Sequence, residues 1–325
     1  MMTLIERRAA LGLLGAGLAL AAAPRLATAA PRLIPEQVKT RVIVDNDYSG
    51  DPDGLVALAH QLLSPRSRVT LVTSSFLSDQ FSVPGNIPGQ TARQGRDLAV
   101  ELIARLKPRD RPLIVAGAEG PASPTRALGA AARAIVAEAM RDDPLPLFFT
   151  CGGPLTNLAE ALALEPRIAQ RMSVIWIGGG GYPDGGWEYN LAMDAEAARL
   201  VIERSALPLW QVPQPTYRQM QISVAELAAD MRPISPFSRW LFDRFTSPPD
   251  FIDLGGGWPM GDSPLLLLTA LNPQSSTVRT VPARRIAPDL TYAEEVPGRT
   301  INVFDTVDAR FIHADFLARL KLHRP

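Results

Sequence analysis

Residues 42–55 have the sequence VIVDNDYSGDPDGL, and this stretch decides the fold. A short polar turn in it joins an apolar run, Arg41–Asn46, to a helical pattern, Gly54–Leu63. The run is rich in Val and Ile without strict alternation, as expected for a strand that is covered on both faces. The stretch therefore predicts a strand–turn–helix unit of the kind from which parallel sheets are built.

The same alternation continues along the chain. Further buried strands are expected at Arg68–Ser74, Pro112–Ala116, Pro146–Cys151, Ser173–Gly178 and Leu207–Val212. Helical patterns separate them at Thr91–Leu106, Pro124–Met140, Leu155–Leu164 and Ala195–Glu203. This order predicts an α/β fold with an open, mostly parallel (Rossmann-like) sheet and helices on both faces.

The last third of the chain has a different pattern. Residues 214–262 carry many Pro and Gly, and we interpret them as a helical excursion near the site, with helices at Val224–Met231 and Pro236–Phe245. Two outlying strands and a closing helix are expected at Val278–Val281, Thr300–Val303 and Val307–Leu322. Residues 31–325 are therefore predicted to form a single domain.

The N-terminal residues 1–30 have the pattern of a signal peptide. A charged start precedes an apolar stretch rich in Ala, Leu and Gly, which ends in the small residues Ala27-Thr28-Ala29. The pair Arg7-Arg8 indicates the twin-arginine export route. A retained membrane anchor is the alternative, and the short apolar run disfavours it. We expect a periplasmic or secreted protein without a stable membrane anchor.

Composition excludes some classes of function. With 33 basic and 33 acidic residues the formal net charge is zero, and no run of Lys and Arg suits a nucleic-acid polymer. A hydrophobic fraction of 46% provides a sizeable core. The single cysteine, Cys151, excludes an internal disulfide, and its place after an apolar run indicates a buried structural residue rather than a nucleophile.

An acidic cluster follows the first strand. Asp45, Asp47, Asp51 and Asp53 place four carboxylates within nine residues, and a shared cation is the usual remedy for their repulsion. Oxygen ligands favour calcium or magnesium, and calcium tolerates irregular coordination better. The alternative is a solvated loop in which Asp51 caps the helix before Pro52. Capping leaves Asp45 and Asp47 unexplained, so we predict a metal site beyond the strand ends, where open parallel sheets bind ligands.

This acidic loop resembles the N-terminal signature of the inosine-uridine nucleoside hydrolase family. Four later motifs follow in the family's order: CGGPLTNLA at 151–159, IGGG at 177–180, EYN at 188–190 with DAEAA at 194–198, and GDSPL at 261–265. The resemblance extends from about Arg41 to Leu320. It implies a calcium-dependent enzyme that hydrolyses the N-glycosidic bond of ribonucleosides to ribose and free base.

The resemblance also implies roles for individual residues. Asp47 and Asp262 would bind calcium together with the backbone carbonyl of Gly152. Asp47 would in addition be the general base that activates the attacking water. Asp53 would contact the ribose hydroxyls or the metal, and Glu188 and Asn190 would bind the sugar. Family members are often dimers or tetramers, so the resemblance is also compatible with a homo-oligomer.

Two glycines depart from the family pattern. The family commonly has two consecutive aspartates at the helix start, whereas this chain has Asp53-Gly54. Aligned without a gap, the chain lacks the second aspartate, a bidentate calcium ligand. A one-residue gap would instead let Asp53 bind the metal and Asp51 the ribose. Gly261 stands where several members have a histidine that protonates the leaving base.

No other residue is an obvious general acid. His60, His313 and His323 do not follow a strand, so we interpret them as structural or solvated. Some relatives activate a purine by stacking it on aromatic rings, and Trp187, Trp258 and Tyr182 lie near the right motifs, with ordinary packing as the alternative. The departures leave a second hypothesis open, a degenerate member that binds a nucleoside or sugar without turnover. A third, a module that recognises polysaccharide, lacks an exposed aromatic row.

Overall fold

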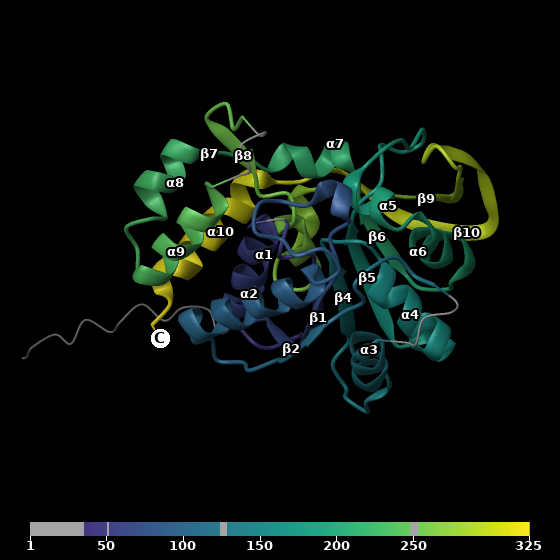
Figure 1. Ribbon diagram of the computed structural model, residues 1–325, viewed down its shortest axis with the longest axis horizontal. Coiled ribbons are helices and arrows are strands. Elements are labelled where there is room, and N and C mark those ends of the chain that lie inside the picture. Colours follow the sequence, from purple (N-terminus) through teal and green to yellow (C-terminus); the bar gives the residue numbers. More distant parts are fainter. Residues whose placement is uncertain (1–35, 51, 124–128, 248–252, 325) are drawn as a thin grey trace, which may run out of the picture. The chain divides into compact units, whose positions relative to one another are not determined.

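The computed structural model describes residues 36–50, 52–123, 129–247 and 253–324 (Figure 1). An eight-stranded sheet runs through these residues in the order β3-β2-β1-β4-β5-β6-β10-β9. The predicted signal peptide, residues 1–30, lies outside the described residues. Among the described residues, no helix is long and apolar enough to cross a membrane.

Parallel pairing dominates this sheet, which confirms the predicted fold class. Six strands pair in parallel: β1 (Thr40–Asn46), β2 (Ser67–Ser74), β3 (Leu113–Ala116), β4 (Leu147–Cys151), β5 (Met172–Ile177) and β6 (Leu209–Val212). Strand β10 (Tyr292–Thr306) pairs in parallel with β6 and antiparallel with β9 (Thr277–Ile286). The order reverses between β1 and β4, so the crevice for a ligand is expected at the carboxyl ends of these two strands.

Helices cover both faces of the sheet (Figure 1). One core contains residues of α1 (Pro52–Leu63), α2 (Thr91–Leu106), α9 (Pro236–Phe245) and α10 (Ala309–Leu322). The opposite core contains residues of α3 (Ala130–Met140), α4 (Thr156–Leu164) and α6 (Ala195–Arg199). Strand β1 supplies Val42 and Val44 to the first core and Ile43 to the second. Each such fully buried aliphatic side chain stabilises the fold by about 1.5–3 kcal/mol.

Shorter elements complete the chain. They are α5 (Tyr189–Met193), α7 (Gln214–Tyr217), α8 (Val224–Asp230), the π-turn Leu200–Arg204, and the antiparallel pair β7 (Gln221–Ser223) and β8 (Gly257–Pro259). Single 3₁₀ turns lie at Asp79–Phe81, Pro166–Gln170, Arg218–Met220, Ser263–Leu266 and Pro273–Ser275. The described part of the excursion at 214–262 therefore contains the two predicted helices and, in addition, a two-stranded antiparallel sheet whose strands flank them.

The largest difference from the sequence prediction is at the sheet edge. The two short outlying strands are parts of one long hairpin, β9–β10, which extends well beyond Val278–Val281 and Thr300–Val303. Most side chains of the extension are exposed or partly exposed, so no apolar periodicity marks them. The predicted helix Ala195–Glu203 is α6 followed by the π-turn. The predicted start of α3, residues 124–128, lies outside the described residues.

Candidate active site

Three chain segments meet at the carboxyl ends of β1 and β4. Asp47 follows β1, Asp53 lies in the first turn of α1, and Asp262 directly precedes the 3₁₀ turn Ser263–Leu266. The backbone N–H of Asp262 donates to Asp53 Oδ2 at 3.0 Å. All three carboxylates are buried, with at most 5% exposure. The fold thus gathers acids that are far apart in sequence.

Asn46 connects this acidic group to the sheet. Its Nδ2 donates to Asp262 Oδ2 at 2.6 Å, and the residue is fully buried. Gly152 lies against the same pair: a Cβ at this position would come within 2.3 Å of Asn46 Nδ2 and 2.4 Å of Asp262 Oδ2. Glycine at 152 therefore permits the close approach of the end of β4 to the acids.

Asp45 has a separate environment. Its carboxylate accepts hydrogen bonds from Thr73, from Ser75 Oγ at 2.9 Å and from Asn157 Nδ2 at 2.7 Å. Burial raises its pKa to about 6, and these hydrogen bonds oppose the shift. Asp45 therefore holds the end of β1 against Thr73, Ser75 and Asn157 in the protein interior. Cys151 lies beside it, fully buried, and burial raises the pKa of its thiol well above the usual range, in keeping with the predicted structural role.

The predicted sugar-binding segment lies against the same strand end. Asn190 Nδ2 donates to the carbonyl oxygens of Gly152, at 3.1 Å, and Ile177, at 2.9 Å. Glu188 is buried, and its Oε2 accepts from the N–H groups of Gly179 and Leu191 at 2.8 and 3.0 Å. Burial raises the pKa of Glu188, and these hydrogen bonds oppose the rise. Part of the reason for a glutamate here is thus the capping of α5.

Tyr217 is a further polar side chain at this place. Its hydroxyl donates to Glu188 Oε1 at 3.1 Å, and its ring lies 3.3 Å from the position of a Cβ at Gly261. The same Cβ would lie 3.1 Å from Asp53 Oδ2. Any side chain at 261 would therefore crowd both the acids and Tyr217. Neither Tyr217 nor Asn46 was predicted as a site residue from the sequence, where only their polar character next to the motifs marks them.

The aromatic candidates divide into two kinds. Trp187 is 49% exposed and forms an edge-to-face cluster with Tyr189 and Phe81, at ring centroid distances of 4.6 Å from Tyr189 and 5.9 Å from Phe81. Trp258, on β8, instead packs against the core of α1 and α9, with its ring 6.5 Å from Phe245. Tyr182 lies beneath Arg279 and Arg284 of β9. Trp187 is therefore the stacking candidate that is available to a ligand, and packing explains Trp258 and Tyr182.

The histidines lie in helices α1 and α10 or just after α10. His60 is fully buried in α1, where its Nε2 lies 2.9 Å from Asp315 Oδ2, and His323 Nε2 lies 2.7 Å from the carbonyl of Leu106. Burial lowers the pKa of His313 to about 4. These environments confirm the structural interpretation of His60 and give none of the three a contact with the acidic group.

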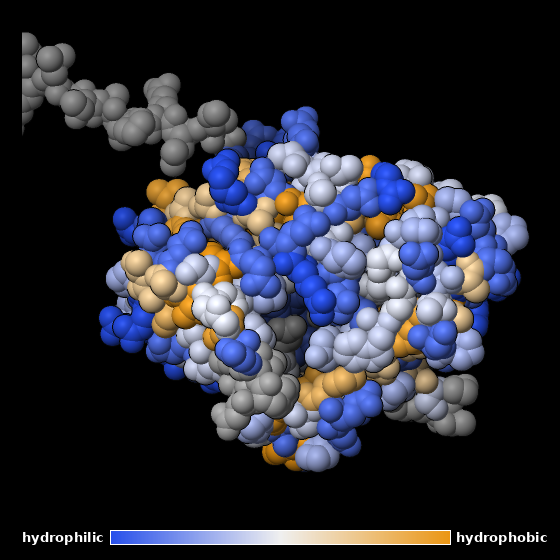
Figure 2. Space-filling model, turned by 90° about the horizontal axis from the view of Figure 1, so that it is seen from above, coloured by the Kyte–Doolittle hydropathy of each residue, from blue (hydrophilic) through white to orange (hydrophobic). Residues whose placement is uncertain are grey.

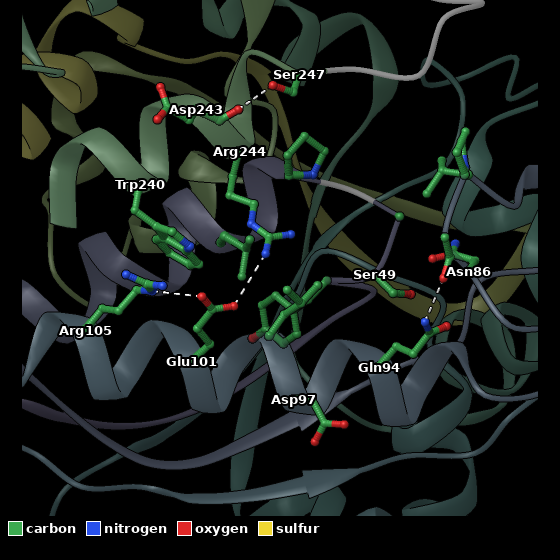
Figure 3. Close-up of a pocket in the computed structure, with 18 residues that line it drawn as sticks. Ser49, Asn86, Gln94, Asp97, Glu101, Arg105, Trp240, Asp243, Arg244 and Ser247 are labelled. Carbon is green, nitrogen blue, oxygen red and sulfur yellow. Dashed lines mark hydrogen bonds and ion pairs between the residues drawn. The ribbon is translucent and has the colours of Figure 1, made fainter. Parts of the chain in front are cut away.

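A cavity of about 1020 Å³ borders the acidic loop on the side of α2 and α9 (Figure 3). Tyr48 and Ser49 form part of its wall. Glu101 of α2 pairs with Arg105 one turn along the same helix, at 2.8 Å, and with Arg244 of α9, at 3.4 Å (Figure 3). None of the described residues predicted to bind metal or sugar lines it. The face seen in Figure 2 is hollowed near its centre, and many hydrophilic residues border the hollow.

The chain is similar in sequence and in fold to known proteins. The family model described as inosine-uridine preferring nucleoside hydrolase matches residues 42–310. The chain belongs to this family. It is accordingly an enzyme of the N-glycosyl hydrolase class, and its family acts on nucleosides, which are small molecules.

Individual relatives agree with the family. A protein of Citrobacter koseri named pyrimidine-specific ribonucleoside hydrolase RihA is 28% identical over 226 residues, which cover 61% of this chain and 70% of the relative. The fold is similar to that of an inosine-guanosine nucleoside hydrolase, with a TM-score of 0.67, 18% identity, and coverage of 89% of this chain and 100% of the other. The plant nucleoside hydrolase PpNRh1 is similar at a TM-score of 0.64, with 20% identity and coverage of 87% and 99%.

A cation fits the chemistry of the acidic group. Asp51, one of the predicted ligands, lies outside the described residues, and within the described ranges no three or more His, Cys, Asp or Glu side chains are already spaced around one point. Hard oxygens are nevertheless near one another there: Asp53 Oδ2 accepts from the backbone N–H of Asp262, and Asp262 Oδ2 accepts from Asn46, the residue before Asp47. Among the described residues, the buried Asn46 Oδ1 has no hydrogen-bond partner and so provides an uncommitted acceptor. Carboxylate and amide oxygens are ligands that calcium prefers.

Proposed function

We propose that this enzyme hydrolyses the N-glycosidic bond of ribonucleosides to ribose and free base with the help of a calcium ion. Asp47, Asp53, Asp262 and the Gly152 carbonyl would hold the ion, and Asp51 is the remaining candidate ligand. When bound, calcium supplies electrostatic activation of a water and a grip on the ribose hydroxyls. The observation that carries the proposal is the hydrogen bond from Asn190 to the Gly152 carbonyl, which joins the sugar-binding segment to the metal-binding group.

The protein's own residues account for the remaining chemistry. Asp47 accepts the proton of the attacking water, because calcium is a weak acid and a base is still needed. Breaking the C–N bond develops positive charge on the sugar, and the buried carboxylates of Asp53 and Glu188 stabilise that charge. Asn190 orients the sugar. The exposed ring of Trp187 offers a stacking surface for the base in place of a protonating histidine.

The second candidate is a family member that binds a nucleoside or sugar without turnover. Gly54 and Gly261 motivate it, and so does the bond between Asn46 and Asp262, which already satisfies part of one predicted metal ligand. Calcium binding does not separate the two candidates, whereas turnover does.

The test is the steady-state release of free base and reducing sugar from a panel of purine and pyrimidine ribonucleosides. The enzyme is assayed with calcium, with a chelator and as Asp47→Asn. Asp142→Asn, an exposed aspartate just before β4 and so at the opposite end of the sheet, is the matched control. We expect turnover that is lost on chelation and in Asp47→Asn but kept in the control. Folded enzyme that releases no base from any ribonucleoside with calcium present would exclude hydrolysis and favour the binding role.

Export is part of the proposal. The signal-peptide pattern of residues 1–30 supports a periplasmic or secreted enzyme that acts on external nucleosides. Fractionation of cells that express the full chain, with and without Arg7→Lys and Arg8→Lys, tests the export route. Light scattering of the purified enzyme tests the homo-oligomer that the family resemblance suggests.

A further inference from the structure

The amide of Asn46, the last residue of β1, has one engaged end and one free end. Its Nδ2 donates to Asp262 Oδ2 at 2.6 Å. The reverse orientation would place two oxygens at that distance, so the bond fixes which way the amide faces. Oδ1 is then left buried, with no hydrogen-bond partner among the described residues. Buried polar atoms are nearly always paired, so this oxygen calls for a ligand, a water or a cation.

Two glycines make room for this amide. A Cβ on Gly54 would lie 2.5 Å from Asn46 Oδ1 and 2.6 Å from its Cγ. A Cβ on Gly152 would lie 2.3 Å from its Nδ2. The amide therefore fills the space between the start of α1 and the end of β4, and a side chain at position 54 is possible only if Asn46 moves. The glycine at position 54 and the asparagine at position 46 therefore depend on each other sterically.

The surroundings favour a cation over a water at the free oxygen. Asp262 Oδ2 contacts the Nδ2 end of the same amide, Asp53 accepts from the backbone N–H of Asp262, and Asp47 is the next residue in the chain. Buried carboxylates this close raise the local negative potential, which attracts a cation. An amide oxygen is also an ordinary calcium ligand.

We propose that Asn46 Oδ1 is a ligand of the bound cation and takes the place of the carboxylate that is missing at position 54. The inference rests on the cation of the proposed function. A neutral oxygen replaces a charged, bidentate group, so the site holds calcium more weakly than one with the full set of carboxylates. Gly54 is then a compensated substitution and not a sign of a lost site.

Calcium binding to the full chain tests this assignment without reference to activity. Isothermal titration calorimetry and the calcium-dependent shift of thermal unfolding are measured for the wild type, Asn46→Ala and Asn46→Asp. Loss of the amide should weaken calcium binding at least about tenfold. Removal of a residue that only orients a metal ligand already weakens binding by about that factor, so loss of a ligand should cost no less. Asn46→Asp should bind calcium more tightly than the wild type but unfold more easily in chelator, because its carboxylate faces Asp262.

Asn157→Ala is the matched control. Asn157 is also a buried asparagine beside the strand ends, but both its ends are engaged, Nδ2 with Asp45 at 2.7 Å and Oδ1 with the N–H of Ala118 at 3.1 Å. Its loss should lower stability and leave the calcium affinity within about twofold, since it offers no free oxygen. A matching loss of affinity in Asn157→Ala would show that any buried amide suffices and would overturn the assignment.

An exchange of the two positions gives a second test, which also serves if Asn46→Ala fails to fold. Gly54→Asp alone should destabilise the protein, because its Cβ meets the amide of Asn46. The double variant Asn46→Ala with Gly54→Asp removes the obstruction and should regain calcium affinity. Failure of the double variant to bind calcium better than Asn46→Ala would contradict the exchange.

Other outcomes separate this inference from the proposed function. Wild-type binding in Asn46→Ala, or binding that begins only when Asn46 is removed, would overturn the assignment even if nucleosides are hydrolysed. Binding that begins only after removal of Asn46 would mean that Asn46 Nδ2 occupies the position of the cation in the wild type. Calcium binding that depends on Asn46 in an enzyme that hydrolyses no nucleoside would support the assignment and refute the proposed function.

Discussion

Substitution of Gly152 by alanine tests the close approach on which the whole site depends. The added Cβ would lie 2.3 Å from Asn46 Nδ2 and 2.4 Å from Asp262 Oδ2, so these two side chains must separate. Loss of their charge-assisted hydrogen bond costs about 1.5–3 kcal/mol, and overpacking of a filled interior costs about 1–3 kcal/mol. We therefore expect the free energy of unfolding to fall by about 2.5–6 kcal/mol, and calcium affinity to fall with it.

The measurement is urea-induced unfolding in chelator, followed by calcium titration of the folded variant. Gly257→Ala is the control, because its Cβ would meet only the flexible end of Gln221, at 3.3 Å, and a backbone carbonyl at 3.5 Å. The control should lie within about 1 kcal/mol of the wild type, as substitutions without a core or network effect usually do. A Gly152→Ala variant as stable as Gly257→Ala would show that the strand ends are not tightly packed and would refute the reasoning.

Three further predictions concern neighbouring residues. Tyr217→Phe removes one hydrogen bond to Glu188, which keeps its two backbone donors. We therefore expect KM for the best nucleoside to rise about fivefold with little change in kcat. An unchanged KM would show that Glu188 does not need Tyr217. Trp187→Ala should lower the free energy of unfolding by about 1–3 kcal/mol, because it removes the ring contacts with Tyr189 and Phe81, and should also weaken nucleoside binding measured by steady-state kinetics. Equal KM values would exclude stacking on this ring. Burial lowers the pKa of His313 to about 4, below its unfolded value of 6.5, so the stability that the neutral ring contributes above that value is lost as the pH falls toward the folded pKa. Between about pH 7.5 and 4.5 the wild type should lose about 2–3 kcal/mol more than His313→Gln in urea unfolding, and parallel pH profiles would contradict this.

The sequence predicted the strands and the acidic loop because their signals are local. Buried parallel strands show as Val- and Ile-rich runs, and Asp47 follows directly from the first of them. The contacts that complete the site are not local. The bond between Asn46 and Asp262 joins residues 216 positions apart, and no pattern in either segment specifies it.

The sheet edge was predicted poorly for another physical reason. Strand β9 carries Arg279, Pro282 and Arg284, and its side chains alternate only weakly between buried and exposed. Pairing with β10 along its whole length stabilises it, and its buried residues Val281, Ala283 and Ile286 are spaced among exposed ones too irregularly to mark the full strand. Similarly, Gly54 was interpreted from the sequence only as a missing ligand, since the packing of Asn46 against it becomes visible only in three dimensions.

The contacts of Asp262 with Asn46 and Asp53 also affect how the chain folds. They close loops of 216 and 209 residues, which link the first strand to the last quarter of the chain. Contacts of such long range form late, because the entropy of loop closure must be overcome before they contribute. A ligand that binds only the closed arrangement therefore stabilises the entire chain rather than one loop. Calcium binding at Asp262 thus reports whether the segment around Asn46 and the segment around Asp262 have come together.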